Sequence, residues 1–378
     1  MEQFIPLSVP NLKGNELKYV TEAVNSEWVS TAGAFVTRFE KEFAEYAGVP
    51  EAAAVQSGTA ALHLAMIECA IAQGDLVIAP ALTFIAAVNP ITYVGAEPVF
   101  MDCDDSLCID PKKLEQYLKE QCQSRDGVTY DKTLGKPIKA INVVHVFGNI
   151  ADMERIIELS ENHNIIVIED ATEAVGTFYT SGKYKGQMAG TIGDIGAYSF
   201  NGNKIITTGG GGMLVTRDLE RTKHARHLAA QAKSDELYFT HDEIGFNYKM
   251  TNIQAALGVA QLEQLEHFIT TKKENYNLYK SLGVELHPFR EEIRPNYWFY
   301  SHLTNKRDKL IKYLNDYKAQ SRPIWHLIHE LPFYKQYRNY KIEKARYYHN
   351  HLVNIPCSSS LNSTGVHRVA ELINTFEG

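Results

Sequence analysis

TIGDIGAYSFNGNKIITTGGGGMLV, residues 191–215, combines a single lysine with a run of four glycines. The lysine is Lys204, and it lies between an apolar, aromatic segment of strand type and the glycines Gly209 to Gly212. A glycine inside a helix or strand costs roughly 0.5–1 kcal/mol relative to alanine. The run therefore indicates backbone that turns tightly or approaches another group closely.

Lys204 sits in a partly apolar turn, Asn203-Lys204-Ile205-Ile206. An ammonium in such a turn is poorly solvated, and desolvation lowers the pKa of a lysine. A neutral lysine amine can form a Schiff base with a carbonyl compound. The same segment also fits a surface lysine beside a glycine turn, so other parts of the chain must distinguish the two interpretations.

The composition is that of a globular protein of about two domains. The chain has 378 residues, of which 44% are hydrophobic and 22% are charged, and its length allows a sizeable core. The formal net charge of -7 and the lack of a basic tract argue against a nucleic-acid partner. Any anionic substrate must then be held by local groups.

The cysteines and the start of the chain indicate a cytoplasmic protein. The five cysteines lack the paired spacings of a zinc site, as expected of free thiols in a reducing compartment, and we expect no metal site. The first residues lack the apolar core of a signal peptide. No run of about 18 apolar residues occurs, so we expect no membrane partner.

Short apolar runs alternate with helical patterns through the first 250 residues. This alternation predicts a largely parallel sheet covered by helices on both faces. After the long helix expected from about 251 to 268, the composition shifts towards Tyr, His, Lys and Asn. We therefore predict a large α/β domain over 1–250 and a smaller α+β domain over 251–378, with that helix as the link.

Ligands of parallel sheets bind at the carboxyl ends of the strands, and two polar motifs fall there. Ser57, Gly58 and Thr59 follow a strand and open a helix, where unpaired backbone N–H groups and the helix dipole favour an anion such as phosphate. The same residues would also serve as a plain helix cap. Asp170 ends another apolar strand and needs a cation or hydrogen-bond donors, because an unpaired buried charge is costly.

Four features together indicate one cofactor. They are the phosphate-type turn at Ser57, the strand-end carboxylate of Asp170, the hydroxyl of Ser199 near Lys204, and Phe84, which either packs in the core or covers a flat ring. Pyridoxal 5'-phosphate carries a phosphate, a basic ring nitrogen, an aldehyde and a flat face, and so uses all four. The chain has no GxGxxG motif after a first strand, so a dinucleotide site has no support.

The chain resembles the DegT/StrS sugar-nucleotide aminotransferases, which have the aspartate aminotransferase fold. The resemblance implies a pyridoxal-phosphate-dependent transferase of fold type I, with a large sheet domain and a smaller C-terminal α+β domain. It extends over nearly the whole chain, and the motifs that carry it are WVS at 28–30, SGTAAL at 57–62, EDATEA at 169–174, GDIGAYSFNGNK at 193–204, GFNYKMTNIQAALG at 245–258 and RPIW at 322–325.

The resemblance also implies residue roles. Lys204 would bind the cofactor covalently and then move protons, and Asp170 would pair with the pyridine nitrogen, a charge-assisted bond worth about 1.5–3 kcal/mol. Ser199, with the backbone of Gly58 and Thr59, would hold the phosphate, and Phe84 would stack on the ring. Asn247 resembles the residue that such enzymes lend to the neighbouring subunit's phosphate, which implies a homodimer with shared active sites.

Glu173 departs from the commonest family pattern. Relatives often have glutamine there, whose amide can bond the 3'-oxygen of the cofactor. A carboxylate facing a phenolate would be repelled unless one of them holds a proton. We therefore hypothesise that Glu173 is protonated or faces the substrate.

Lys204 also favours transamination over elimination, because dehydratases of the family carry histidine at this position. We expect glutamate as amino donor and a nucleotide-linked keto sugar as acceptor. The candidates for holding the diphosphate and base are Trp28, Lys249, Arg322 and Trp325.

The motifs NGNKIITTGGGGM, SRPIW and NIPCSSSL resemble enzymes that aminate C4 of UDP-2-acetamido-2,6-dideoxy-hexos-4-ulose for surface glycans. GDP-perosamine synthases and 3-amino sugar aminotransferases remain alternatives. A non-catalytic regulator that keeps the fold is a hypothesis of another class, and a lyase or desulfurase of the same fold is a further rival.

Overall fold

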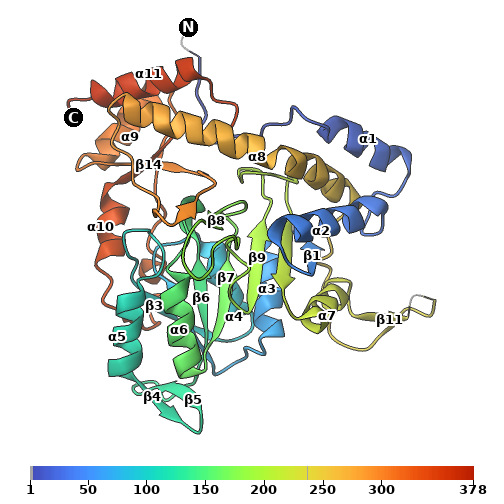
Figure 1. Ribbon diagram of the computed structural model, residues 1–378. Coiled ribbons are helices and arrows are strands. Elements are labelled where there is room, and N and C mark those ends of the chain that lie inside the picture. Colours follow the sequence, from blue (N-terminus) through green and yellow to red (C-terminus); the bar gives the residue numbers. More distant parts are fainter. Residues whose placement is uncertain (1–2, 236) are drawn as a thin grey trace.

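The computed structural model describes residues 3–235 and 237–378 (Figure 1). Among these residues a sheet of eight strands forms the centre of the larger part of the molecule. In spatial order its strands are β1 (Glu51–Val55), β10 (Gly212–Thr216), β9 (Ile195–Ser199), β7 (Ile166–Asp170), β6 (Ile138–Val144), β2 (Leu76–Pro80), β3 (Glu97–Met101) and β16 (Asn339–Tyr340).

The sheet is parallel from β9 to β16, while β10 runs antiparallel to both of its neighbours. Reversing direction twice leaves β1 pointing the same way as β9. The carboxyl ends of β1, β9, β7, β6 and β2 therefore meet at one edge. The central strands are buried along their length, as expected of a sheet covered on both faces.

The helices that cover the sheet start at polar residues that cap them. Ser57, Asp110, Asp152 and Asp218 each accept a hydrogen bond from a backbone N–H of the helix that follows, which satisfies donors left open at a helix start. Packed side by side are α5 with α6, and α3 with α4 and α7. Their bounds are α3 (Gly58–Glu68), α4 (Asn89–Tyr93), α5 (Pro111–Gln121), α6 (Met153–His163) and α7 (Leu219–Ala229).

The long helix α8 (Asn252–Ser281) crosses the molecule above the sheet (Figure 1). It begins at a capping box formed by Thr251 and Gln254. Our expectation that it ends near residue 268 was wrong, because a buried stripe continues through Lys272, Tyr276 and Tyr279. Packed along this helix are α1 (Glu16–Asn25) and α2 (Ala34–Ala47).

The segments after α8 form a smaller α+β layer around a three-stranded antiparallel sheet. Two short strands return to the larger part, because β16 pairs with β3, and β13 (Ile293–Arg294) pairs with β8 (Phe178–Tyr179). The domain boundary at 250 therefore stays a prediction. The elements of the layer are β14 (Tyr300–Leu303), α9 (Arg307–Asp316), β15 (Arg322–Pro323), α10 (Lys344–His351), β17 (Leu352–Ile355) and α11 (Ser363–Asn374).

Short elements complete the described chain. Two hairpins join β4 to β5 and β11 to β12, and 3-10 turns lie at three strand ends or loops. Within residues 3–235 and 237–378, no helix is long and apolar enough to cross a membrane. The bounds are η1 (Ile85–Ala87), β4 (Cys122–Arg125), β5 (Val128–Asp131), η2 (Val146–Gly148), β11 (Lys233–Asp235), β12 (Thr240–His241) and η3 (Ile328–Glu330).

Gly258 gives a test of the packing between α8 and α2. A Cβ at this position would lie 2.7 Å from ring atoms of the fully buried Phe39. We expect Gly258→Ala to lower the free energy of unfolding. Overpacking costs about 1–3 kcal/mol, whereas the higher helix propensity of alanine stabilises the helix by only about 1 kcal/mol. Chemical denaturation measures the change.

The matched control is Glu274→Ala on the exposed side of the same helix, for which we expect a change within about 0.5 kcal/mol. A free energy of unfolding that is unchanged or raised in Gly258→Ala would contradict the close contact with Phe39.

Candidate active site

A cavity of about 600 Å³ opens at the carboxyl edge of the large sheet and is closed on the other side by the smaller layer. Four charged residues line it, Asp170, Glu173, Lys204 and Arg322. The sequence motifs at 57–59, 84, 170–173 and 199–204 all reach this cavity, because their strands end at the same edge.

The turn that opens α3 is packed tightly against the glycine run. A Cβ on Gly58 would lie 2.7 Å from the Cβ of Ser199, and a Cβ on Gly212 would lie 2.5 Å from the carbonyl oxygen of Ser57. Only glycine lets these three backbones meet. Gly212 also begins β10, so the run is both a close approach and a strand start.

Ser57 serves as the helix cap, since its Oγ accepts from the backbone N–H of Ala60 at 3.1 Å. Within the described residues, the backbone N–H groups of Gly58 and Thr59 have no acceptor, and they begin the helix beside the hydroxyl of Ser199. Both interpretations of the motif therefore apply at once. The side chain caps the helix, and the backbone leaves donors for an anion.

Lys204 is held over an aromatic ring inside the cavity. Its Nζ lies 4.0 Å from the ring centroid of Trp298 and 3.6 Å from Oε1 of Glu173. The Trp298 ring is fixed by a hydrogen bond from its Nε1 to the carbonyl oxygen of Asn203, 2.8 Å away. Burial lowers the pKa of Lys204, although Glu173 and Asp170 act to raise it.

Glu173 is also buried, and its pKa shifts in the opposite direction to that of Lys204. Burial raises its pKa from the ordinary 4.5 to about 7, against the lowering effects of Lys204 and of the backbone N–H of Phe147. That N–H donates to Oε2 at 2.9 Å. Burial thus favours the neutral form of both Glu173 and Lys204, so one proton is readily exchanged between carboxyl and amine.

Asp170 lies at the end of β7 with its side chain in the cavity wall. Burial raises its pKa, and hydrogen bonds from Thr172 oppose the rise. One of them runs from the Thr172 backbone N–H to Oδ1 over 3.1 Å. A buried carboxylate with so few donors is suited to receive a cationic N–H from a ligand.

The remaining predicted residues divide into two groups. Phe84 lines the cavity and is 52% exposed, so it is available to a ligand and is no part of the core. Arg322 and Trp325 also line the cavity. Trp28 borders a separate depression next to Gly33.

In the described chain, Asn247 and Lys249 line neither the cavity nor the depression beside Trp28. Asn247 is exposed and bridges Ala230, and Lys249 bridges Val55. The predicted role of Lys249 in holding diphosphate therefore has no support from its own subunit's cavity. The predicted role of Asn247 concerns a second subunit.

Sequence reasoning did not single out several residues of the cavity wall. Trp298 and Phe147 flank Lys204 and Glu173, and Phe147 packs on Trp325 with ring centroids 4.8 Å apart. Phe147 has a left-handed φ of 57°, a strained value for this residue type, next to Gly148. The Phe-Gly-Asn turn after β6 was the signal for Phe147, whereas nothing local marked Trp298.

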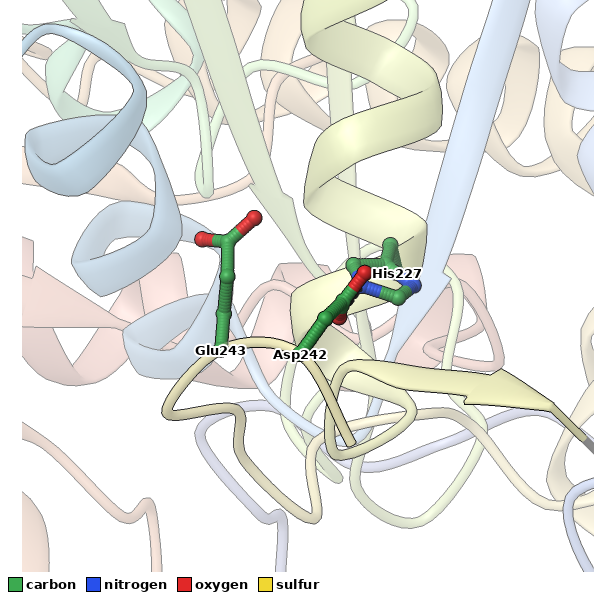
Figure 2. A group of neighbouring side chains, drawn as sticks. All are labelled: His227, Asp242 and Glu243. Atoms are coloured by element: carbon green, nitrogen blue, oxygen red, sulfur yellow. Dashed lines mark hydrogen bonds and ion pairs between the residues drawn. The ribbon is translucent and has the colours of Figure 1, made fainter. Parts of the chain in front are cut away.

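A separate cluster lies on the surface around α7 (Figure 2). His227, Asp242 and Glu243 offer ligand atoms within 4.8 Å of one another. Asp242 pairs with Nε2 of His227 at 2.7 Å, and Glu243 pairs with Nε2 of His224 at 3.2 Å. These contacts fasten the loop before Gly245 to α7, and they engage each member of the cluster.

Fold and cavity define an α/β enzyme whose buried lysine stands at the carboxyl edge of the sheet. The model of the DegT/DnrJ/EryC1/StrS aminotransferase family matches residues 10–374, and the chain belongs to this family.

Similar proteins cover almost the whole chain. The GDP-perosamine synthase of Escherichia coli O157:H7 is 40% identical over 381 residues, 99% of either chain. That of Caulobacter vibrioides is 37% identical over 377 residues, 97% of this chain and 96% of the relative. The crystal structure of the aminotransferase TlmJ from Streptoalloteichus hindustanus superposes with a TM-score of 0.88 at 27% identity, with 98% of either chain covered.

The chain is therefore a sugar aminotransferase of fold type I that depends on pyridoxal 5'-phosphate. The cavity fits this cofactor. Lys204 offers an amine for the aldehyde and Asp170 a carboxylate for the ring nitrogen. The open N–H groups of Gly58 and Thr59 suit the phosphate, and Phe84 offers a flat apolar face. The individual roles stay predictions.

Glu173 allows a test by pH. Because its pKa is raised, the folded chain binds more protons than the unfolded chain between pH of about 4.5 and about 7, and its free energy of unfolding falls as pH rises through that window. We expect the free energy of unfolding of the cofactor-free Glu173→Gln protein to increase relative to that of the natural protein as pH rises from about 5 to about 8. Urea denaturation over this range measures it, with Glu274→Gln on the exposed side of α8 as control. Parallel pH profiles for the two proteins would contradict the raised pKa.

Proposed function

We propose that this protein transfers the amino group of glutamate to C4 of a nucleotide-linked 4-keto-6-deoxy sugar. The observation that carries the proposal is the buried pair of Lys204 and Glu173, 3.6 Å apart in the wall of a cavity of about 600 Å³. A cavity of this size is within the range of small-molecule sites.

The chain's residues would contribute positioning and proton transfer. When bound, pyridoxal phosphate supplies the carbonyl that carries the amino group and the ring that withdraws electrons. Lys204, whose pKa is lowered by burial, would take a proton from the substrate carbon and return it. Asp170 would keep the ring nitrogen protonated, and Glu173 would accept a proton from Lys204 and return it.

A GDP-linked sugar is the first candidate acceptor. It is favoured by two relatives of nearly equal length that are named GDP-perosamine synthase, at 40% and 37% identity. The second candidate is UDP-2-acetamido-2,6-dideoxy-hexos-4-ulose, which the motifs around Lys204, Arg322 and Cys357 favour. The two differ in the base and in the group at C2 of the sugar, and both carry the 4-keto group that accepts the amine.

The absorbance of the bound cofactor separates these possibilities. We expect glutamate to convert the spectrum of the holoenzyme to that of the amine form, because Lys204 and Asp170 complete the site for transamination. Adding the GDP-linked 4-keto-6-deoxy sugar should restore the original spectrum, and the UDP-linked sugar is the parallel trial. Recovery with the UDP sugar alone would reverse the preference, and recovery with neither would contradict a 4-keto sugar acceptor.

We also propose that the active site is completed by a second copy of the chain, through Asn247. The support is that Asn247 is exposed and away from its own subunit's cavity, although its motif is the one expected at the phosphate. Closed twofold dimers are the commonest assembly of identical chains.

Complementation between two inactive variants tests this sharing. Lys204→Ala and Asn247→Ala should each have little activity alone. Co-expressed, they should form mixed dimers with one intact site each, which gives roughly a quarter of the natural activity for random pairing. If the mixture shows only the sum of the separate residual activities, Asn247 does not serve the partner's site.

A further inference from the structure

Three polar residues form a row on the sheet of the smaller layer, on the side that faces the cavity. Arg322 on β15 lies directly opposite Asn354 on β17, and Asn354 lies directly opposite Ser301 on β14. Side chains opposite each other in a sheet point to the same face. Gln320 lies two residues before Arg322, and Gln320, Arg322 and Asn354 all line the cavity.

Hydrogen bonds within the protein fix the direction of both amides. The backbone N–H of Leu7 donates to Oε1 of Gln320 at 3.0 Å. The hydroxyl of Ser301 donates to Oδ1 of Asn354 at 2.7 Å. With each carbonyl oxygen engaged, the NH₂ group is the part of each amide that remains for a ligand, and both side chains line the cavity.

Charge identifies the kind of ligand that fits this wall. Besides Lys204, Arg322 is the only cation among the described residues that line the cavity, and both lining carboxylates, Asp170 and Glu173, belong to the other wall. Two fixed N–H donors beside a guanidinium match the oxygens of a carboxylate or a phosphate.

We infer that Gln320, Arg322 and Asn354 form a subsite for an oxyanion of the substrate, with Ser301 as the positioning residue for Asn354. The identity of the anion rests on the proposed function. Amino donor and nucleotide sugar use the same Lys204 in succession, so the subsite takes a carboxylate of glutamate, the diphosphate of the sugar nucleotide, or each in turn.

The test replaces a donor by an acceptor of the same shape. Asn354→Asp and Gln320→Glu keep the bonds from Ser301 and Leu7 but present a carboxylate oxygen to the cavity. The matched control is Asn350→Asp, the same chemical change at an exposed position of α10. The probes are glutarate, a dicarboxylate without an amine, and pyrophosphate, titrated calorimetrically into the holoenzyme.

We expect both cavity variants to bind at least one probe ten-fold or more weakly than the natural protein and Asn350→Asp. Weakened glutarate binding assigns the subsite to the donor's carboxylate, and weakened pyrophosphate binding assigns it to the diphosphate. Ser301→Ala should weaken the same probe to a smaller degree, because the Asn354 amide loses its fixed direction.

Unchanged binding of both probes in Asn354→Asp and Gln320→Glu would overturn the inference. The absorbance of the bound cofactor confirms that each variant is folded, and Arg322→Gln, which leaves both amides intact, replaces a variant that is not. Since neither probe is turned over, the result is independent of which sugar restores the spectrum. Failure of the proposed acceptor is therefore distinguishable from failure of the subsite.

Discussion

The desolvation of Lys204 is the constraint on which the rest of the site depends. An amine is useful for carbonyl chemistry when it is neutral, and burial between Trp298 and Glu173 favours that form. A carboxylate so close would normally stabilise the ammonium. Here Glu173 is itself buried, and its pKa is raised to about 7, so burial outweighs the attraction between the two charges.

The edge of the large sheet brings chemically different groups of the active site together at one point. Strands β1, β7 and β9 end at this edge, where β1 is followed by the start of α3, β7 ends in the carboxylate of Asp170 and β9 ends in the hydroxyl of Ser199. Side chains alternate between the two faces of β7, so the adjacent carboxylate of Glu169 points away from Asp170 and accepts from His145 and from the N–H groups of Gly190 and Ile192. One strand end thus presents a functional carboxylate on one face and a structural one on the other.

The smaller layer closes the cavity and adds the groups that the sheet edge lacks. It brings Trp298 over Lys204, and it carries a row of donors that faces the two carboxylates across the cavity. The chain returns from this layer to the large sheet through β16, so the two parts are joined by strand pairing as well as by α8. These connections hold the smaller layer against the sheet edge that carries Asp170 and Glu173.

The sequence by itself determined the α/β architecture, the cavity edge and most of the cofactor site, because these depend on local signals. The apolar strands that precede Ser57 or end in Asp170 or Ser199, and the glycines that follow Lys204, can be recognised from their neighbours along the chain. The opposed pKa shifts of Lys204 and Glu173, the position of Trp298 over Lys204 and the hydrogen bonds to the amides at 320 and 354 came only from the tertiary structure. Each joins residues far apart in sequence, and burial, which sets their charge and direction, exists only after the chain has folded.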